Sequence, residues 1–313
     1  MKTGRIITLS FLFSLFHLAL VIGSSPAKAE HLEQRASIET FHVGHGPKYL
    51  AFDGANVWVT LDVDNAVAKL RASDGIILGT FDVGRCPTWI TFDGTNIWVA
   101  NFCDNSLTKL RASDGAHIAD YLVAGRPTGM AWDGANIWVA SYDDGTVTKM
   151  QGSDGTVLGV FQVGPGPEGV VFDAANIWVA NNVGKSVTKL RASDGGFLLE
   201  ASVGGDAIGI VFDGTKIWTA NDLDNSLTAL RASDGAVLGT FQVGYRATGI
   251  AFDGSRIWST LNSAAGNVAN VSARSGAGEK RINVGGHPMG VLFDGTSIWV
   301  ANLADNTVNK ITP

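Results

Sequence analysis

Short stretches in which apolar and polar residues alternate, separated by turn residues, follow one another along most of the chain. One such pair, 227–231 and 237–243, flanks a Ser-Asp-Gly turn, and another, 249–252 and 257–260, flanks an Asp-Gly turn. Alternation with period two is typical of half-buried β-strands, and glycine accepts the positive φ of a tight hairpin turn. Helix-length periodic segments are absent after residue 29. The pattern predicts a chain of antiparallel hairpins.

The hairpins belong to a repeat marked by tryptophan. The repeated tryptophans are spaced by 40 residues five times and then by 41, at Trp58, Trp98, Trp138, Trp178, Trp218, Trp258 and Trp299. Each repeat contains four strand-like runs, which we name a, b, c and d in chain order. Four antiparallel strands in about 40 residues, repeated radially, describe a propeller blade. We therefore predict an all-β fold, a single seven-bladed β-propeller of four-stranded antiparallel blades over residues 30–313.

The two ends of the repeat array complement each other. The last repeat stops at Pro313 after its run c, so its outer strand is missing. The segment 38–44 has the sequence of a lone run d and matches 239–244. We expect this N-terminal outer strand to complete the last blade, which gives 28 strands and leaves no open sheet edge.

Residues 1–29 have the pattern of a signal peptide. Basic residues precede an apolar run at 6–22, and a small-x-small triplet follows at 27–29. The apolar run has about the minimum length of a membrane span, so a transmembrane anchor is the alternative. The triplet favours cleavage before Glu30. We expect a periplasmic or secreted product without a membrane anchor.

Composition and charge narrow the classes of partner. The sequence is 45% hydrophobic and 17% charged, which suits a large core and excludes a disordered chain. Without residues 1–29, the chain has 20 Lys and Arg against 29 Asp and Glu, a formal charge of −9. A nucleic-acid partner needs a basic face that neutralises phosphates, so we expect none. We expect a monomer whose partner is a ligand or another protein.

The two rims of the predicted propeller differ in how constant their residues are. The a-to-b turns, on one rim, repeat Asp-Gly almost without change, as turn geometry requires. Residues near the start of run a, on the other rim, differ between blades, which marks a candidate functional face or, alternatively, drift at an exposed surface. The candidate ligand-binding residues are His45, Lys48, Tyr49, Arg85, Trp89, Arg126, Glu168, Asp206, Tyr245, Arg246 and His287.

Aromatic and basic residues within the repeat have both structural and functional interpretations. Tyr49 and Trp89 stand in run a where the other five blades have glycine. Such neighbours can form a stacking floor for a sugar or another planar ligand, or they can fill a packing gap. The repeated tryptophans lie in the middle of run b, which favours packing between blades over a cofactor stack. The arginines next to the Ser-Asp-Gly turns favour turn bracing or solvation, at Arg71, Arg111, Arg191 and Arg231.

Cys86 and Cys103 are the only cysteines, and they are symmetric about the turn at Asp93 and Asn96. A two-residue hairpin there would place them opposite each other at a non-hydrogen-bonded pair of strands a and b. The close Cα atoms of such a pair suit a disulfide, which export would allow to form. A free thiol pair or a metal site is the alternative, but no histidine has a matching spacing.

Familiar catalytic patterns are missing. The histidines show no metal-type spacing, and there is neither a Gly-x-Ser-x-Gly elbow nor a P-loop. We therefore assign no catalytic residue, metal ligand or cofactor. The absence favours a binding or scaffold protein over an enzyme.

The strand-b phrases resemble the YVTN-type family of β-propeller repeats over the whole chain after residue 29. They read Trp58-Val-Thr-Leu61, Trp98-Val-Ala-Asn101, Trp178-Val-Ala-Asn181 and Trp299-Val-Ala-Asn302. The resemblance implies a seven-bladed propeller in an exported bacterial or archaeal protein. It implies little about a ligand, because that family is functionally mixed.

The sequence also resembles the streptogramin lyase group, in which a histidine after the repeat's proline and a glutamate ending strand b serve a magnesium-assisted ring opening. Here no histidine follows the repeat's proline and no glutamate ends strand b, and His287, one place before Pro288, has no carboxylate partner at the matching site. The post-proline positions hold Lys48, Thr88, Thr128, Glu168, Ile208, Thr248 and Met289.

Calcium-dependent lactonase-type propellers are similar only in fold. Such a site would need Glu168, Asp206, Asn181 and Asn221 to converge on the channel. We therefore expect a protein that recognises a small molecule, a glycan or a protein on the variable rim. The alternative is a metal-dependent propeller enzyme, streptogramin lyase-like or lactonase-like, that uses calcium or magnesium.

Overall fold

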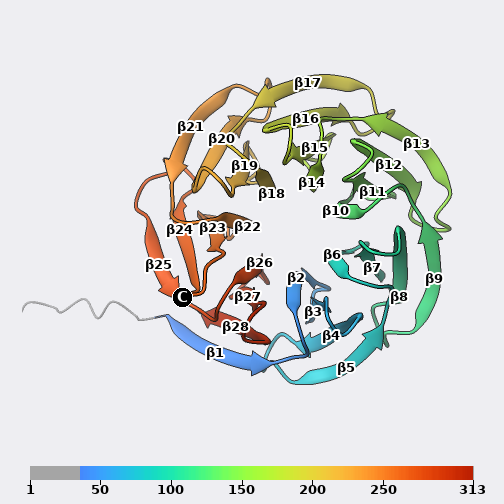
Figure 1. Ribbon diagram of the computed structural model, residues 1–313, viewed down its shortest axis with the longest axis vertical. Coiled ribbons are helices and arrows are strands. Elements are labelled where there is room, and N and C mark those ends of the chain that lie inside the picture. Colours follow the sequence, from blue (N-terminus) through green and yellow to red (C-terminus); the bar gives the residue numbers. More distant parts are fainter. Residues whose placement is uncertain (1–35, 313) are drawn as a thin grey trace, which may run out of the picture. The chain divides into compact units, whose positions relative to one another are not determined.

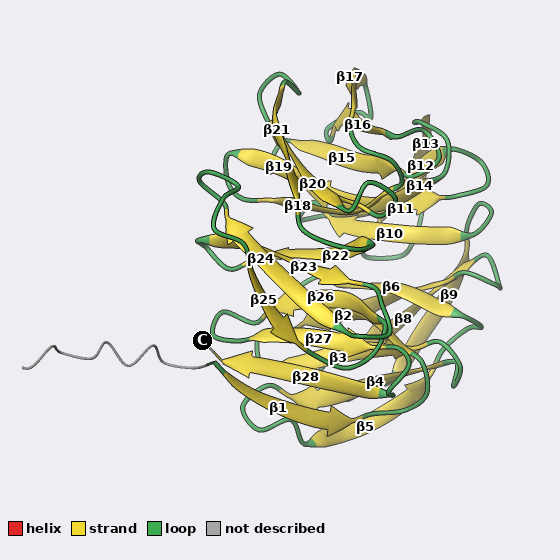
Figure 2. Ribbon diagram, turned by 60° about the vertical axis from the view of Figure 1, so that its left-hand side comes forward, coloured by secondary structure: helices red, strands yellow, loops and turns green. Residues whose placement is uncertain are grey.

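The computed structural model describes residues 36–312, which form a ring of seven four-stranded antiparallel sheets (Figure 1). Residues of the innermost strands line a central channel. Strands and loops make up this ring (Figure 2). The predicted fold class is confirmed. The predicted signal peptide lies outside the described residues. Within 36–312, no helix has the length and hydropathy needed to cross a membrane.

Each sheet runs from an inner strand at the channel to an outer strand at the circumference. The inner strands are β2 (Pro47–Phe52), β6 (Pro87–Phe92), β10 (Pro127–Trp132), β14 (Pro167–Phe172), β18 (Ala207–Phe212), β22 (Ala247–Phe252) and β26 (Pro288–Phe293). The second strands are β3 (Asn56–Leu61), β7 (Asn96–Asn101), β11 (Asn136–Ser141), β15 (Asn176–Asn181), β19 (Lys216–Asn221), β23 (Arg256–Leu261) and β27 (Ile298–Asn302). The third strands are β4 (Ala66–Arg71), β8 (Ser106–Arg111), β12 (Thr146–Gln151), β16 (Ser186–Arg191), β20 (Ser226–Arg231), β24 (Asn267–Ser272) and β28 (Thr307–Thr312). The outer strands are β5 (Ile77–Asp82), β9 (His117–Leu122), β13 (Val157–Gln162), β17 (Phe197–Ser202), β21 (Val237–Gln242), β25 (Lys280–Asn283) and β1 (Ser37–His42).

The ring closes in the way that the incomplete last repeat predicts. Strand β1 pairs antiparallel with β28, in a register that runs from Ser37 opposite Thr312 to His42 opposite Thr307. The seventh sheet therefore has the order β1-β28-β27-β26, and its outer strand comes from the beginning of the chain (Figure 1). This pairing covers the edge of β28 that would otherwise be open.

The repeated tryptophans form the contacts between blades. All seven are buried. Trp58 of the first blade, for example, packs in one cluster with Ile90, Ile97 and Val99 of the second. The interpretation as inter-blade packing is confirmed, and it explains why an aromatic side chain recurs in the middle of every second strand.

The turn aspartates do more than the turn alone requires. In the third blade, Oδ1 of Asp133 accepts hydrogen bonds from the backbone N–H groups of Ala135 and Asn136. Its Oδ2 accepts the indole N–H of Trp138 at 2.8 Å. The same indole bond is present in all seven blades. One carboxylate thus caps the turn and satisfies the only polar atom of the buried tryptophan side chain.

A buried lysine links neighbouring blades. Lys69 Nζ donates to the carbonyl oxygens of Ala112 and Ser113 in the next blade, at 2.7 and 3.1 Å. The same ammonium lies 4.9 Å from the ring centroid of Trp58. The arrangement recurs at Lys109, Lys149, Lys189 and Lys310. Carbonyl acceptors and an aromatic face compensate for burying these charges, a role the sequence analysis did not assign.

The four arginines for which we expected turn bracing or solvation brace their turns and are partly solvated. Arg71 Nη1 donates to Asp74 in the adjacent Ser-Asp-Gly turn at 2.9 Å. The other three make the same pair. Because these side chains are about half exposed, the pairs contribute little to stability.

Every inner strand contains a β-bulge near its start. In the fourth blade, Pro167 lies opposite Asn181 and pairing resumes at Val170 opposite Val179, so two residues of β14 face one of β15. The other six inner strands have the same irregularity. A bulge changes the direction of the side chains it contains. The bulge therefore redirects the second and third residues of each inner strand, which lie at the channel mouth.

One a-to-b turn has a strained residue. Ala174 has φ of 76°, whereas the other six turns have glycine there with φ of 94° to 99°. We expect Ala174→Gly to raise the free energy of unfolding by about 1 kcal/mol, because positive φ is costly for an L-residue with a Cβ atom. Urea unfolding would measure it. Ala175→Gly is the control and should be neutral or destabilising; a less stable Ala174→Gly variant would contradict the expectation.

Candidate functional site

A cavity of about 240 Å³ opens at the channel mouth, on the rim of the d-to-a and b-to-c loops. Its lining residues come from all seven inner strands, from the loops after β7, β19 and β23, and from the loop before β22. They are Lys48, Tyr49, Thr88, Trp89, Phe102, Thr128, Glu168, Ile208, Asp222, Arg246, Thr248, Asn262 and Met289. All seven post-proline positions of the repeat are in this set.

Tyr49 and Trp89 stack on each other, with ring centroids 3.8 Å apart and planes inclined by 25°. Both rings also line a second cavity of about 140 Å³ in the channel, together with the inner-strand glycines and aliphatic residues. Those glycines pack closely against the next blade; a Cβ at Gly169 would lie 2.5 Å from the carbonyl oxygen of Ile208. The aromatic pair both fills space in the channel and offers a surface to the mouth cavity.

Glu168 is the most perturbed acid of the site. It is the second residue of β14, lies in the bulge and is partly buried. Burial, reinforced by the carboxylates of Asp206 and Asp222, raises the pKa of Glu168 to about 7, although Lys48 acts in the opposite direction. Burial and the charge of Glu168 likewise raise the pKa of Tyr49 well above its usual value. A carboxyl group with a pKa near neutrality can both hold and release a proton.

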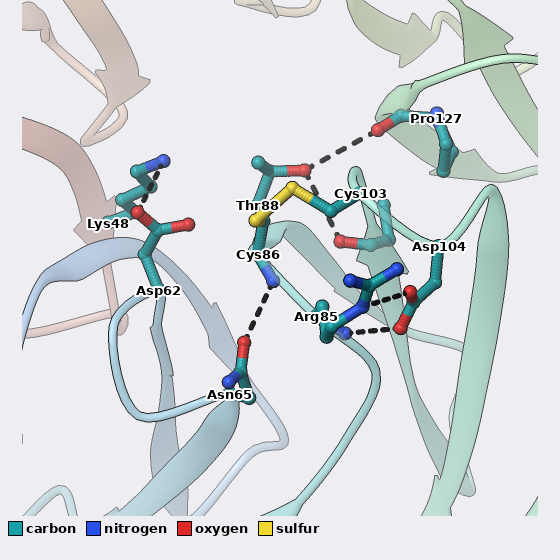
Figure 3. Close-up of a disulfide and its surroundings, with 10 residues drawn as sticks. Lys48, Asp62, Asn65, Arg85, Cys86, Thr88, Cys103, Asp104 and Pro127 are labelled. Carbon is teal, nitrogen blue, oxygen red and sulfur yellow. Dashed lines mark hydrogen bonds and ion pairs between the residues drawn. A yellow bond between two sulfur atoms is a disulfide. The ribbon is translucent and has the colours of Figure 1, made fainter.

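The two basic side chains of the cavity are already paired. Lys48 Nζ lies 3.0 Å from a carboxylate oxygen of Asp62 (Figure 3). Arg246 donates from Nε and Nη2 to the carboxylate of Asp222, with the shortest contact at 2.8 Å. Asp222 is buried, and its hydrogen bonds and charge raise the pKa of Arg246 further.

The structure gathers five of the eleven sequence-predicted residues at the cavity, namely Lys48, Tyr49, Trp89, Glu168 and Arg246. The other six are on the rim and outside the cavity lining: His45, Arg85, Arg126, Asp206, Tyr245 and His287. Three of these pair with an aspartate of the b-to-c loop in their own blade: His45 with Asp64, Arg85 with Asp104 and Arg126 with Asp143.

The remaining rim residues have different surroundings. The side chain of Tyr245 is 63% exposed. His287 Nδ1 lies 3.0 Å from Oδ1 of Asn262, an amide rather than a carboxylate. Asp206 contributes to the site through its charge, which helps to raise the pKa of Glu168.

Cys86 and Cys103 form a disulfide beside the cavity, with Cα atoms 5.4 Å apart (Figure 3). The predicted bond is confirmed, but the predicted strand position is wrong. The bulge in β6 shifts the register, so Phe102 donates its N–H to the carbonyl of Cys86 and both cysteines lie in loops beyond the paired strands. The bond closes a separation of 17 residues and contributes about 3 kcal/mol in the chain-entropy description. Such a bond is typical of an oxidising compartment.

A lactonase-like site would need Asn181 and Asn221 to face the cavity, but neither residue lines it. Both side chains are fully buried. The Nδ2 of Asn181 donates to the hydroxyls of Ser186 and Thr188 in its own blade, and Asn221 makes the equivalent bonds. Among residues 36–312, no group of three or more His, Cys, Asp and Glu side chains is placed to hold a metal ion.

Sequence reasoning missed Asp222, Phe102 and Asn262 as site residues. Each is the first residue after a second strand, in the b-to-c loop. This position varies between blades, with only Asp and Asn occurring twice, and it holds Asp62, Phe102, Tyr142, Asn182, Asp222, Asn262 and Leu303. The same comparison between repeats that marked the d-to-a loops would therefore have marked this position.

Comparison with known proteins adds information on the fold. No protein-family model and no curated protein sequence matches the chain. The structure of a streptogramin B lyase has a TM-score of 0.76 and 19% identity, covering 88% of this chain and 97% of the other. The structure of Kuenenia stuttgartiensis hydrazine synthase has a TM-score of 0.77 and 17% identity, covering 87% and 98%. At these identities the shared property is the propeller fold.

Proposed function

We propose that this chain is an exported binding protein that holds a small molecule in the mouth cavity. One observation carries the proposal: a single cavity collects a side chain from every inner strand, and five different residue types occupy these seven equivalent positions. A concave, mainly apolar site with a few convergent polar groups is typical of small-molecule binding. A rigid ring that presents variable residues at one mouth supports the same use.

Export and repeat family are parts of this proposal. The pattern of residues 1–29 supports a cleaved signal peptide, and the disulfide supports a periplasmic or secreted location. The tryptophan-centred phrases of the second strands support membership of the YVTN-type repeat family.

A ligand screen by thermal shift tests the proposal, using neutral, cationic and anionic small molecules with and without calcium or magnesium. We expect at least one compound to raise the melting temperature of the wild-type protein, because ligand that binds only the folded state stabilises it. Ile208→Trp should abolish the shift by filling the cavity. Leu238→Trp on the outer strand β21 is the matched control and should keep it. Shifts that survive Ile208→Trp would place binding elsewhere and contradict the proposal.

The second candidate is an enzyme that uses Glu168 as a general acid or base. The observation that favours it is the pKa of Glu168, raised to about 7. The fold shared with a streptogramin B lyase is compatible with it. Mass spectrometry of the compounds recovered after incubation separates the candidates: a binding protein returns its ligand unchanged, whereas an enzyme returns a product that Glu168→Gln no longer forms.

A further inference from the structure

Both basic side chains of the mouth cavity are in ion pairs, whereas the acid Glu168 is not, so Glu168 is the charged group available to a ligand. Asp62 neutralises Lys48, and Asp222 neutralises Arg246 (Figure 3 shows the first pair). Within residues 36–312, no protein group donates a hydrogen bond to the carboxylate of Glu168. Asp206 adds a second negative charge nearby. A partly buried carboxylate without a protein donor is left to water or to a ligand, and a cationic ligand would supply the compensating charge.

Aromatic surface adjoins this acid. The rings of Tyr49, Trp89 and Phe102 line the same cavity as Glu168. The guanidinium of Arg126 already lies 5.4 Å from the ring centroid of Phe102, so Tyr49 and Trp89 are the rings left for a ligand. Aromatic faces attract cations through their quadrupole and pack against apolar groups. We infer that the cavity takes a small organic cation, an amine or quaternary ammonium with an apolar body, whose charge lies at Glu168 and whose body lies against the rings. This inference rests on the proposed function and narrows its ligand class.

Other charged ligands fit the same surroundings less well. An anion would have to separate Lys48 from Asp62 or Arg246 from Asp222. Calcium and magnesium prefer six or more oxygen ligands, several of them from carboxylates or waters. In the described part of the chain, no three candidate ligand side chains converge on one point.

Protonation of Glu168 should compete with a bound cation. The titratable and charged groups that act on Glu168, or that its charge acts on, are Lys48, Tyr49, Tyr142, Asp206 and Asp222, with Arg246 paired to the last. Because the pKa of Glu168 is about 7, the carboxylate is half protonated at neutral pH. A cation favours the ionised form, so affinity should fall by about tenfold for each pH unit below that pKa.

Isothermal titration with two probes of the same shape tests the inference: choline, which is cationic, and 3,3-dimethylbutan-1-ol, its neutral carbon analogue. One pH unit above the pKa of Glu168, we expect choline to bind at least about tenfold more tightly than the alcohol. Glu168→Gln should remove this preference and the pH dependence together. The variant should fold, because it replaces an acid whose ionised form is disfavoured by burial. Glu39→Gln, on the exposed outer strand β1, is the matched control and should behave as wild type.

The outcomes separate this inference from the proposed function. Equal affinity for both probes, or a choline preference retained in Glu168→Gln, would overturn the organic-cation assignment while leaving the cavity as a binding site. Competition of calcium with choline at Glu168 would identify a metal site instead and overturn it too. Absence of choline binding at millimolar concentration would also overturn the organic-cation assignment. Failure of the proposed function would be seen in a different measurement: compounds would still raise the melting temperature of the Ile208→Trp variant.

Discussion

Asp133→Ala is expected to lower the free energy of unfolding by about 3 kcal/mol, the sum of a lost turn cap and a buried indole N–H without acceptor. The carboxylate accepts from the backbone of Ala135 and Asn136 and from the indole of Trp138. Trp138 is fully buried between blades, so its indole N–H loses its acceptor at a position away from bulk water. Urea unfolding, followed by tryptophan fluorescence, would measure the change.

The control for this substitution is Asp82→Ala, because Asp82 is exposed on the outer strand β5. It should change stability by less than about 0.5 kcal/mol. An effect of Asp133→Ala no larger than that of Asp82→Ala would show that the turn carboxylate does not hold the tryptophan.

The same network predicts a loss of stability in acid. Burial acts to raise the pKa of Asp133, but hydrogen bonds from Trp138, Asn136 and the turn backbone outweigh it and hold the pKa below its usual value. The pKa values of five equivalent aspartates are lowered for the same reason. A lowered folded-state pKa gives stability that is present above the unfolded-state pKa and is lost as pH falls through the folded-state value. We expect the melting temperature to fall steeply below about pH 4, and less steeply in Asp133→Asn.

Phe41→Ala should destabilise the ring by about 3 kcal/mol, because the side chain belongs to two blades at the closure. Its ring stacks on Trp299 of the seventh blade, with centroids 5.8 Å apart. It also packs with the core of the first blade and contacts the turn there, since a Cβ at Gly75 would lie 2.1 Å from the ring. The variant therefore weakens the interface between the first and seventh blades. Urea unfolding measures the loss.

Phe197→Ala provides the comparison for Phe41→Ala. Phe197 is also on an outer strand, β17, but its side chain is 62% exposed. Its removal should cost less than about 0.5 kcal/mol. Equal effects of the two substitutions would mean that the closing strand is held by its backbone pairing with β28 rather than by Phe41.

The candidate site was predictable only in part, and the residues show why. Lys48, Tyr49, Trp89, Glu168 and Arg246 stood out because they break the repeat at the channel end of the inner strands. Asp222 also occupies a position that varies between blades. Its role became visible only through its bidentate ion pair with Arg246, 24 residues away. His45 and Arg85 also vary, yet each pairs with an aspartate of its own blade on the outer rim.

The sequence alone determined the blade number, the closing strand, the hairpin turns and the partners of the disulfide. These properties follow from local signals, alternation with period two and turn chemistry, copied at a constant interval. The tertiary structure decided which variable residues meet. The bulge after Pro167 redirects Glu168 to the channel mouth, and the equivalent bulge in β6 moves Cys86 out of its expected strand pair. Alternation assigns a side chain to one face or the other, so a single bulged residue reverses the assignment. Only the closed ring brings seven inner strands, distant in sequence, around one cavity.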